Sequence, residues 1–349
     1  MPDPIQFSRR SFMLMPLALA ACKFGPDVFR LSGQTMGTTY NVVATGDSVS
    51  EGEVQSAIDA ALARVNAQMS NWDAGSEIST FNARLDTDSV TMSPELAEVM
   101  QAAEAVHQAS EGTFDTTMGP LIELWGFGAP GKREMPDDAA IAAALQRSGH
   151  GNTLQVGATG LQKRQGEAQV YLAAIGKGYG ADLVGRALED LGITDYMVEI
   201  GGDLYASGRN PDGQPWQIGI ESPNAHDRGM LDVIGVSGAG LASSGDYRNY
   251  FERDGKRYSH VIDPRTGRPV THHTASATVL ADNAMLADAW ATAMLILGSE
   301  RGLEVADAQG IAVMFVDRDG GAGQTGFTTA QSTLFASKTT KPIASRGIT

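Results

Sequence analysis

Apolar side chains recur every three to four residues over several stretches of the chain, which is the period of an amphipathic helix. The first such stretch covers residues 54–69, and the second begins at Ser93-Pro94, a favourable helix start. We predict two further helices over residues 137–149 and 178–191, the latter ending before Gly192. The apolar positions of the first two stretches are Val54, Ile58, Leu62, Val65 and Met69, and then Leu96, Val99, Met100 and Val106.

Shorter apolar or alternating runs predict β-strands between these helices. Helices and strands are mixed without strict βαβ alternation, and this order favours the α+β class over a doubly wound parallel sheet. No repeat or Pro/Gly-rich linker divides the chain, so we expect one compact domain of mixed sheets and packed helices over residues 31–336, with a flexible tail over residues 337–349. The strand-like runs are residues 196–200, 216–220, 231–236, 258–262, 276–280 and 311–316.

The most apolar helix pattern, residues 284–297, carries two polar side chains on one face. An Asp-Asn pair before it supplies a cap, and Gly298 after it is a good stop. Asp288 and Thr292 are spaced i, i+4, so they project from the same side one turn apart. A buried carboxylate is costly unless it is paired or binds a cation. Either Asp288 is satisfied by a neighbouring Arg or backbone amide, with Thr292 bonded to a helix carbonyl, or both supply oxygen to a hard cation such as Mg²⁺.

The first residues predict an export signal. Arg9-Arg10 lies in a twin-arginine sequence, and the apolar segment after it is too short for a permanent membrane span. Leu19-Ala20-Ala21-Cys22 matches the cleavage box of bacterial lipoproteins, in which the cysteine is lipidated. We expect a twin-arginine/lipoprotein signal peptide over residues 1–21, a lipidated tether over residues 22–30, and a location on the periplasmic side of the bacterial membrane, anchored through Cys22. A plain signal peptide with a chance cysteine is the alternative.

The composition is acidic, with 26 Lys and Arg against 41 Asp and Glu and a formal net charge of −15. This balance argues against nucleic acid as a partner and against electrostatic adhesion to anionic lipid, which leaves the acyl chain to hold the membrane. Cys22 is the single cysteine in the sequence, so no intramolecular disulfide can form.

Three glycine-rich motifs carry candidate chemistry. In Ala173-Ala174-Ile175-Gly176-Lys177-Gly178, backbone amides and one lysine converge on a helix N-terminus, where an anion is favoured. Glu199-Ile200-Gly201-Gly202-Asp203 follows a strand, and its paired glycines let the backbone approach a ligand. Residues 114–121 with residues 125–128 join Asp115 to aromatic surface that can stack on a flat ring. A plain helix start, a tight strand exit and aromatic core packing explain the same motifs without a ligand.

A further cluster of polar side chains flanks the strand predicted near residue 260. Acid, hydroxyl, imidazole and guanidinium groups come there from different elements, as they do in an active site. His260 can instead be a half-buried strand residue bonded to backbone, and Arg248 can pair with Asp246 for structural reasons. The two segments are Ser243-Ser244-Gly245-Asp246-Tyr247-Arg248-Asn249-Tyr250 and Ser259-His260-Val261-Ile262-Asp263-Pro264-Arg265-Thr266-Gly267.

Taken in order, these motifs resemble the bacterial FAD:protein FMN transferases, the ApbE-like flavin transferases. The resemblance covers roughly residues 31–334. It implies an ApbE-like domain that uses Mg²⁺, cleaves FAD, transfers the FMN half to a Ser or Thr hydroxyl of a flavoprotein in a respiratory or redox complex, and releases AMP. The motifs are Met36-Gly37-Thr38, Phe114-Asp115 with Gly119-Pro120-Leu121, Gly176-Lys177-Gly178-Tyr179, Gly201-Gly202-Asp203, Ser244-Gly245-Asp246-Tyr247-Arg248, His260-Val261-Ile262-Asp263-Pro264-Arg265-Thr266-Gly267, and Ala287-Asp288-Ala289 with Thr292.

The resemblance also assigns roles by motif position. The metal would be held by the Ala174 carbonyl, Asp288 and Thr292, in agreement with the cation site inferred above. His260 resembles the proposed catalytic base, and from its chemistry a nearby acid, Asp263 or else Asp246, could orient it. Contacts with FAD would come from Met36, Trp72, Phe114, Asp115, Tyr171, Lys177 and Ile262.

One position departs from the family pattern. Members usually carry an acid in a Val-Asp-Leu segment that contacts the adenine end of FAD, whereas this chain has Val170-Tyr171-Leu172. Tyr171 can stack or donate a hydrogen bond but cannot supply a carboxylate. Some members also carry a second acid at the position of Ala291, so a single metal is favoured here. Two other functions stay open: an FAD pyrophosphatase that uses water in place of the protein hydroxyl, and a non-catalytic flavin-binding assembly lipoprotein.

Overall fold

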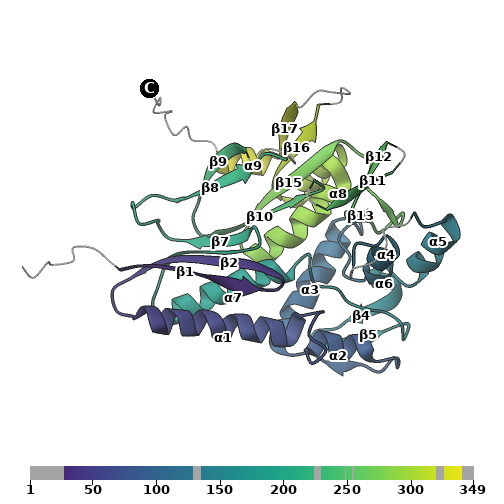
Figure 1. Cartoon of the computed structure of the whole chain (residues 1–349), viewed down its shortest axis with the longest axis horizontal. Coiled ribbons are helices and arrows are strands. Elements are labelled where there is room, and N and C mark those ends of the chain that lie inside the picture. Colours follow the sequence, from purple (N-terminus) through teal and green to yellow (C-terminus); the bar gives the residue numbers. More distant parts are fainter. Residues whose placement is uncertain are drawn as a thin grey trace, which may run out of the picture.

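An eight-stranded antiparallel sheet lies at the centre of the computed structural model (Figure 1). The structure describes residues 27–128, 135–223, 229–247, 249–253, 255–319 and 326–339. The strands, in their order across the sheet, are β1 (Asp27–Thr35), β2 (Thr38–Gly46), β6 (Asp195–Ile200), β7 (Asp203–Ser207), β10 (Ala239–Gly245), β15 (Thr274–Ala281), β16 (Ala312–Arg318) and β17 (Phe327–Gln331).

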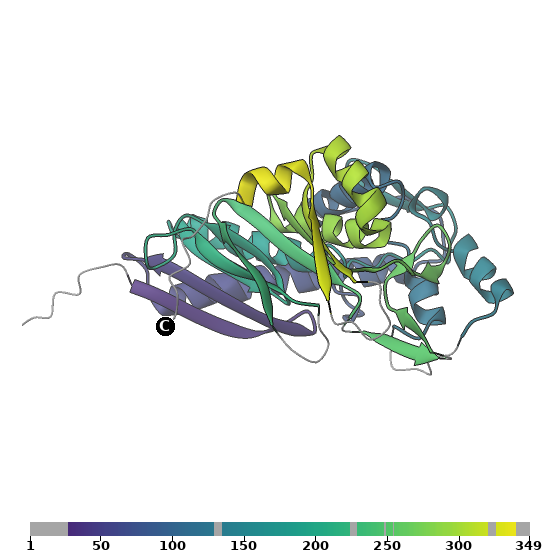
Figure 2. The ribbon, with the colours of Figure 1, turned by 90° about the horizontal axis from the view of Figure 1, so that it is seen from above.

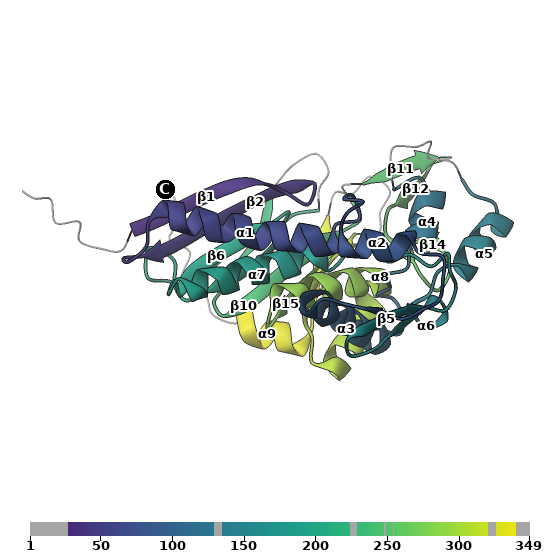
Figure 3. The same ribbon diagram turned by 90° about the horizontal axis from the view of Figure 1, so that it is seen from below.

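Four helices form a layer on one side of this sheet, as the views from the side and from below show (Figures 1 and 3). Two of them, α7 and α8, pack directly on the sheet, and α1 and α3 pack on these two. Their apolar faces share one core, which includes Ile58, Val99, Val184 and Met294. The four helices are α1 (Glu51–Met69), α3 (Pro94–Ala109), α7 (Gly176–Asp190) and α8 (Ala284–Gln309).

The opposite side of the sheet is covered by a hairpin and a short helix. The hairpin of β8 (Trp216–Glu221) and β9 (Met230–Val236), together with α9 (Thr333–Thr339), buries a second core against it. Leu204 of β7 and Leu241 of β10 point into this second core. The central strands are therefore buried on both sides, and seven consecutive residues of β15 are buried although Thr274, Ser276 and Thr278 are among them.

The remaining elements lie at one end of the molecule, away from the β1–β2 hairpin (Figures 1 and 2). A small core that contains Leu121, Trp125, Ile141 and Ile262 joins several of them. The elements are α2 (Glu77–Ala83), α4 (Gly119–Leu124), α5 (Asp138–Gln146), α6 (His150–Thr153), β3 (Val90–Thr91), β4 (Leu154–Val156), β5 (Gly160–Lys163), β11 (Tyr250–Arg253), β12 (Lys256–Ser259), β13 (Ile262–Asp263) and β14 (Arg268–Pro269).

The α+β class and the single compact domain are confirmed, and most predicted elements are present. The helices predicted from residues 54–69 and from Ser93-Pro94 onward are α1 and α3, and the Ser93 side chain accepts a hydrogen bond from the amide of Leu96 as a cap. The helix predicted over residues 137–149 is shorter, because α5 ends at Gln146.

Two apolar runs fold differently from their simple patterns. Gly298 breaks the helical backbone of α8 with φ of 75° and ψ of 170°, but a helix resumes directly after it and ends at Gln309. The strand predicted over residues 258–262 is divided, since β12 ends at Ser259 and β13 begins at Ile262.

The domain limits also differ from the expected ones by a few residues. β1 begins at Asp27, within the predicted tether, and α9 runs to Thr339, within the predicted tail. Phe29 and Phe335 are both buried, so these segments belong to the packed domain. The predicted signal peptide and Cys22 lie outside the described residues. None of the helices in the described part of the chain combines the length and the apolar character needed to cross a membrane.

The start of α8 is fixed by two side chains from outside the helix. Asn283 accepts a hydrogen bond from the amide of Leu286, so it is the cap of the predicted Asp-Asn pair. Asp182 of α7 accepts from the amides of Ala284 and Met285, both at 2.8 Å. These amides have no partner within the helix, so Asp182 satisfies them and joins α7 to α8. This contact also fixes the position of Asp288, which lies one turn further along α8.

Candidate active site

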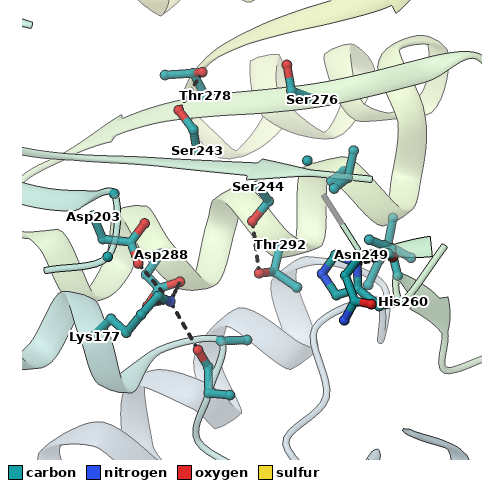
Figure 4. A pocket seen from close by; sticks show the side chains of 18 of the residues that line it. Lys177, Asp203, Ser243, Ser244, Asn249, His260, Ser276, Thr278, Asp288 and Thr292 are labelled. Carbon is teal, nitrogen blue, oxygen red and sulfur yellow. Dashed lines mark hydrogen bonds and ion pairs between the residues drawn. The ribbon is translucent and has the colours of Figure 1, made fainter. Parts of the chain in front are cut away.

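A cavity of about 610 Å³ lies where the start of α7, the middle of α8, the β6–β7 turn and the end of β10 meet. The loop before α4 and the segments on either side of the β11–β12 hairpin close it. In Figure 4 Asp203 and Asp288 lie on one side of the Ser244–Thr292 pair, and His260 lies on the other side. The polar lining includes Lys177, Asp203, Ser243, Ser244, Asn249, His260, Ser276, Thr278, Asp288 and Thr292, and the apolar lining includes Phe114, Met118, Ile122, Leu204, Ile218, Leu241, Val261, Ile262 and Leu295.

One lysine and two buried carboxylates form the charged centre of the cavity. The Lys177 Nζ lies 2.8 Å from Asp203 Oδ2 and 3.3 Å from Asp288 Oδ2, and it also donates to the Ala173 carbonyl at 3.2 Å. Asp203 is 4% exposed and Asp288 is 3% exposed. Burial and the charge of Asp288 raise the pKa of Asp203 to about 7, although Lys177 opposes the shift. Burial lowers the pKa of Lys177, but the two carboxylates outweigh it and raise this pKa.

Asp288 therefore has a lysine partner, and an amide partner as well. The amide of Gly178 donates to Asp288 Oδ2 at 3.2 Å, and the amide of Gly176 donates to the Leu172 carbonyl. The amides of Gly176 and Gly178 are thus bonded to groups of the protein itself. The side chain of this turn that lines the cavity is Lys177. Thr292 bonds with Ser244 across the cavity wall at 3.2 Å.

The residues predicted to hold a metal lie around the same cavity. Ala174, Asp288 and Thr292 all line it, and they offer a carbonyl, a carboxylate and a hydroxyl oxygen. When both carboxylates are ionised they exceed the single ammonium by one negative charge, so the donors and the charge fit a hard divalent cation. The described residues contain no group of three or more His, Cys, Asp and Glu side chains that could hold a metal. A cation here would complete its coordination with water or substrate oxygens.

His260 lies between β12 and β13, held by the backbone of Asn249. The His260 amide donates to the Asn249 carbonyl at 3.0 Å, and the His260 Nδ1 lies 3.0 Å from the same oxygen. A carbonyl only accepts, so Nδ1 carries the hydrogen, and in the neutral ring Nε2 is the nitrogen that can take a proton. The ring meets Phe127 edge-on.

Asp263 and Asp246, the two acids expected to orient His260, pair with arginines instead. The Asp263 carboxylate accepts from the backbone amide and the guanidinium of Arg265. Asp246 pairs with Arg318 of β16. The backbone carbonyl next to the His260 ring thus takes the place predicted for a carboxylate. Arg248, the other predicted partner of Asp246, lies outside the described residues.

The residues predicted to contact FAD divide into two groups. Phe114, Asp115, Tyr171, Lys177 and Ile262 line the cavity. The Asp115 carboxylate also fixes its own loop, since it accepts from the amide and hydroxyl of Thr117 and from the amide of His150.

Met36 and Trp72 form the second group and are not among the cavity-lining residues. Met36 lies in the β1–β2 turn against Gly180 of α7. Trp72 is 79% exposed, and the Asn71 side chain beside it bonds to Val170 and Leu172 on either side of Tyr171. The contacts of Met36 and Trp72 with FAD stay a prediction.

Tyr171, which stands where the family pattern has an acid, is itself bonded to an acid. Its hydroxyl donates to Glu123 Oε1 at 3.0 Å. Burial and this carboxylate raise the pKa of Tyr171 to about 12, so the hydroxyl stays a donor at neutral pH. The ring packs on Gly119, where a Cβ atom would lie 2.0 Å from Tyr171 Cε2. Glycine at position 119 is therefore required by the close approach of the ring.

The whole-chain comparison agrees with this arrangement. A model of the ApbE family matches residues 36–315. The chain belongs to the ApbE family. This ApbE-family chain is 41% identical to the FAD:protein FMN transferase of Haemophilus influenzae over 332 residues, which is 92% of this chain and 94% of the relative. It is also 41% identical to the protein of the same name from Vibrio cholerae, over 86% of this chain and 90% of the relative. By this membership the protein is a transferase.

Solved structures of the ApbE family have the same fold. The flavin transferase ApbE from Vibrio cholerae superimposes with a TM-score of 0.82 at 37% identity, covering 90% of this chain and 99% of that chain. The apo form of the Pseudomonas stutzeri flavinyl transferase ApbE superimposes with a TM-score of 0.83 at 36% identity, covering 92% and 99%.

Three contributions to the site were not predicted from the sequence. The sequence places Asp203 in a glycine turn but does not identify it as a partner of Lys177, and it does not indicate the Asn249 carbonyl or Glu123. The Gly-Gly-Asp motif was a usable signal for Asp203, because a carboxylate directly after two glycines at the start of a buried strand needs a partner. A backbone carbonyl has no sequence signal.

Proposed function

We propose that this ApbE-family transferase moves the FMN half of FAD to a Ser or Thr hydroxyl of an acceptor flavoprotein, uses Mg²⁺, and releases AMP. Its membership in a family of flavin transferases supports flavin transfer. One cavity joins a lysine and two buried acids to a histidine, and this arrangement supports the use of Mg²⁺ and the transfer to a hydroxyl. With a divalent cation bound at the acids, such a cavity would offer positive charge to a diphosphate at one end, and it has a proton acceptor at the other.

The reaction exchanges one phosphorus–oxygen bond for another. The acceptor hydroxyl oxygen attacks the FMN-side phosphorus of FAD, and the bond from that phosphorus to the bridging oxygen breaks. AMP leaves with the bridging oxygen, and the hydroxyl proton goes to a base. Because the chemistry is displacement at phosphorus, the protein contributes mainly by positioning and by charge stabilisation.

His260 is the proposed base. In the neutral ring the Asn249 carbonyl keeps the hydrogen on Nδ1, so Nε2 is the acceptor for the hydroxyl proton. The same hydrogen bond fixes the orientation of the ring, so that Nε2 lies on the side away from the Asn249 carbonyl.

Lys177 and the metal ligands act at the diphosphate. Lys177 reaches the cavity from the first turn of α7, where the helix dipole adds positive potential. Mg²⁺, held by the Ala174 carbonyl, Asp288 and Thr292, would neutralise charge on the diphosphate oxygens. The aromatic ring of Phe114 and the side chain of Ile262 give the flavin an apolar surface.

The site of action that we propose is the periplasmic side of the membrane. The twin-arginine sequence and the lipoprotein box at Cys22 support export and an acyl anchor. An acceptor subunit in the same membrane would then meet the cavity at a high local concentration.

The products test this proposal. We expect AMP release from FAD only when both Mg²⁺ and an acceptor fragment with a Ser or Thr acceptor are present, measured by chromatography. Asp288→Ala should abolish this Mg²⁺-dependent turnover, because it removes the buried carboxylate ligand. AMP release without the acceptor would indicate an FAD pyrophosphatase, and tight FAD binding with no AMP would indicate a flavin-binding protein.

A further inference from the structure

Lys177 is shared unequally between two carboxylates that belong to different elements. Its Nζ is 2.8 Å from Asp203 at the start of β7 and 3.3 Å from Asp288 in α8 (Figure 4). Nζ is 3.5 Å from the other Asp288 oxygen, at the limit of a hydrogen bond. The ammonium is thus closer to Asp203, while it still screens the acid that is the proposed metal ligand.

The β6–β7 turn passes close to this lysine. Gly201 has φ of 59°, and a Cβ atom at this position would lie 2.8 Å from Thr38 Cγ2 and 3.3 Å from Lys177 Cδ. Gly202 follows with φ of 101°, and Asp203 comes next at the start of β7. The two glycines therefore bring the Asp203 carboxylate alongside the lysine without a side chain between them.

Asp203 has capacity to hold the ammonium more firmly. Its Oδ2 is buried, and no well-aligned hydrogen bond reaches it from the described residues, although Nζ is 2.8 Å away. Asp288, in contrast, also accepts from the amide of Gly178. When a cation takes the Asp288 oxygens, repulsion pushes the ammonium away, and Asp203 is the acid that can receive it.

We propose that Lys177 is a movable internal counter-ion and that Asp203 is the positioning residue that receives its ammonium when a divalent cation binds Asp288. The inference rests on the metal site of the proposed function. With the cation absent, Lys177 is shared between Asp203 and Asp288. With the cation present, Asp203 keeps the Lys177 ammonium beside the cavity, where it can face the diphosphate. The pairing with Asp203 also lowers the free energy needed to move the ammonium away from Asp288.

The test is a calorimetric titration of the folded protein with Mg²⁺ alone, without FAD. Lys177→Met removes the competing ammonium, so Mg²⁺ binding should tighten several-fold. Asp203→Asn keeps the shape but removes the receiving charge, so binding should weaken by about tenfold, the size of a moderate charge interaction. In the Lys177→Met background the same Asp203→Asn change should weaken Mg²⁺ binding by about threefold or less, because no ammonium is left to move.

Other outcomes would overturn the inference. An equal loss from Asp203→Asn in both backgrounds would make Asp203 a direct metal ligand, and unchanged binding in Lys177→Met would mean that the lysine does not compete. The Lys177→Met prediction is a gain, which a damaged fold cannot mimic, and thermal unfolding of each variant checks folding. Glu221→Gln, which removes another cavity carboxylate, is the matched control and should change binding by less than about twofold. If Asp288→Asn bound Mg²⁺ as the parent does, the proposed metal site itself would fail.

Discussion

His260 is the residue on which the proton transfer depends, and its contribution can be measured apart from binding. We predict that His260→Ala leaves the dissociation constant for FAD within about twofold but slows FMN transfer by about 100-fold or more, the usual loss when a general base is removed. Flavin fluorescence gives the binding constant, and single-turnover transfer gives the rate. A parental transfer rate in this variant would remove His260 from the mechanism.

Individual residues were predictable where a local pattern exposed them. The i, i+4 pair Asp288 and Thr292 could be found because two polar groups interrupt an apolar helix. The Lys177–Asp203 pair could not, because it depends on how α7 and β7 are placed in space. A carboxylate was predicted to orient His260. In the structure the backbone carbonyl of Asn249 bonds to the ring instead, and no residue type in the sequence indicates such a group.

At the scale of elements, the contact between α7 and α8 sets the geometry of the charged centre. A Cβ atom on Gly178 would lie 2.2 Å from the Ala284 carbonyl oxygen, which is backbone and cannot move aside easily. We predict that Gly178→Ala lowers the free energy of unfolding by on the order of 3 kcal/mol and weakens Mg²⁺ binding, because it separates Lys177 from Asp288. Chemical denaturation measures the first effect and calorimetry the second.

The matched control for this prediction is Gly52→Ala. Gly52 is exposed in the first turn of α1, and a Cβ atom there would contact nothing within 4 Å. The substitution should leave stability unchanged or raise it by about 1 kcal/mol or less, since alanine favours the helix. Equal losses from the two substitutions would contradict the account of the α7–α8 contact.

Periodicity predicted most elements, but it did not show where one apolar run is divided between two strand pairings. Residues 258–262 read as one strand, yet Tyr258 pairs with Phe251 in one hairpin and Ile262 pairs with Pro269 in another. His260 lies at this change of partner, which is why it reaches the cavity. Gly298 was a correct signal for the end of a helical segment, but the helix that resumes after it has a weaker apolar pattern, with buried Gly302, Val305 and Ala306.

At the scale of the whole molecule, the class could be predicted and the topology could not. Mixed helices and strands without βαβ alternation indicated α+β. The order of the sheet places β2 beside β6, although about 150 residues of chain separate the two strands, and local patterns do not encode such pairings. The family resemblance was the observation that joined the distant motifs into one site.

The proposed membrane anchor gives a prediction for the intact protein in cells. Cys22→Ser should prevent lipidation and move the protein from the membrane fraction to the soluble periplasmic fraction, while the purified domain keeps its transfer activity. Fractionation with labelled fatty acid measures both the location and the lipid. Replacement of Arg9-Arg10 by Lys-Lys is the companion variant and should leave the protein in the cytoplasm. Membrane retention of unlipidated Cys22→Ser would contradict an anchor at this residue.

Covalent transfer of FMN is tested most directly by the intact mass of the acceptor. The mature protein is incubated with FAD, Mg²⁺ and a flavoprotein fragment that carries a Ser or Thr acceptor, and the fragment is then weighed by mass spectrometry. We predict a gain equal to one FMN less water, lost when the acceptor hydroxyl is replaced by alanine. An unchanged fragment mass, with FAD consumed or merely bound, would contradict covalent transfer of FMN.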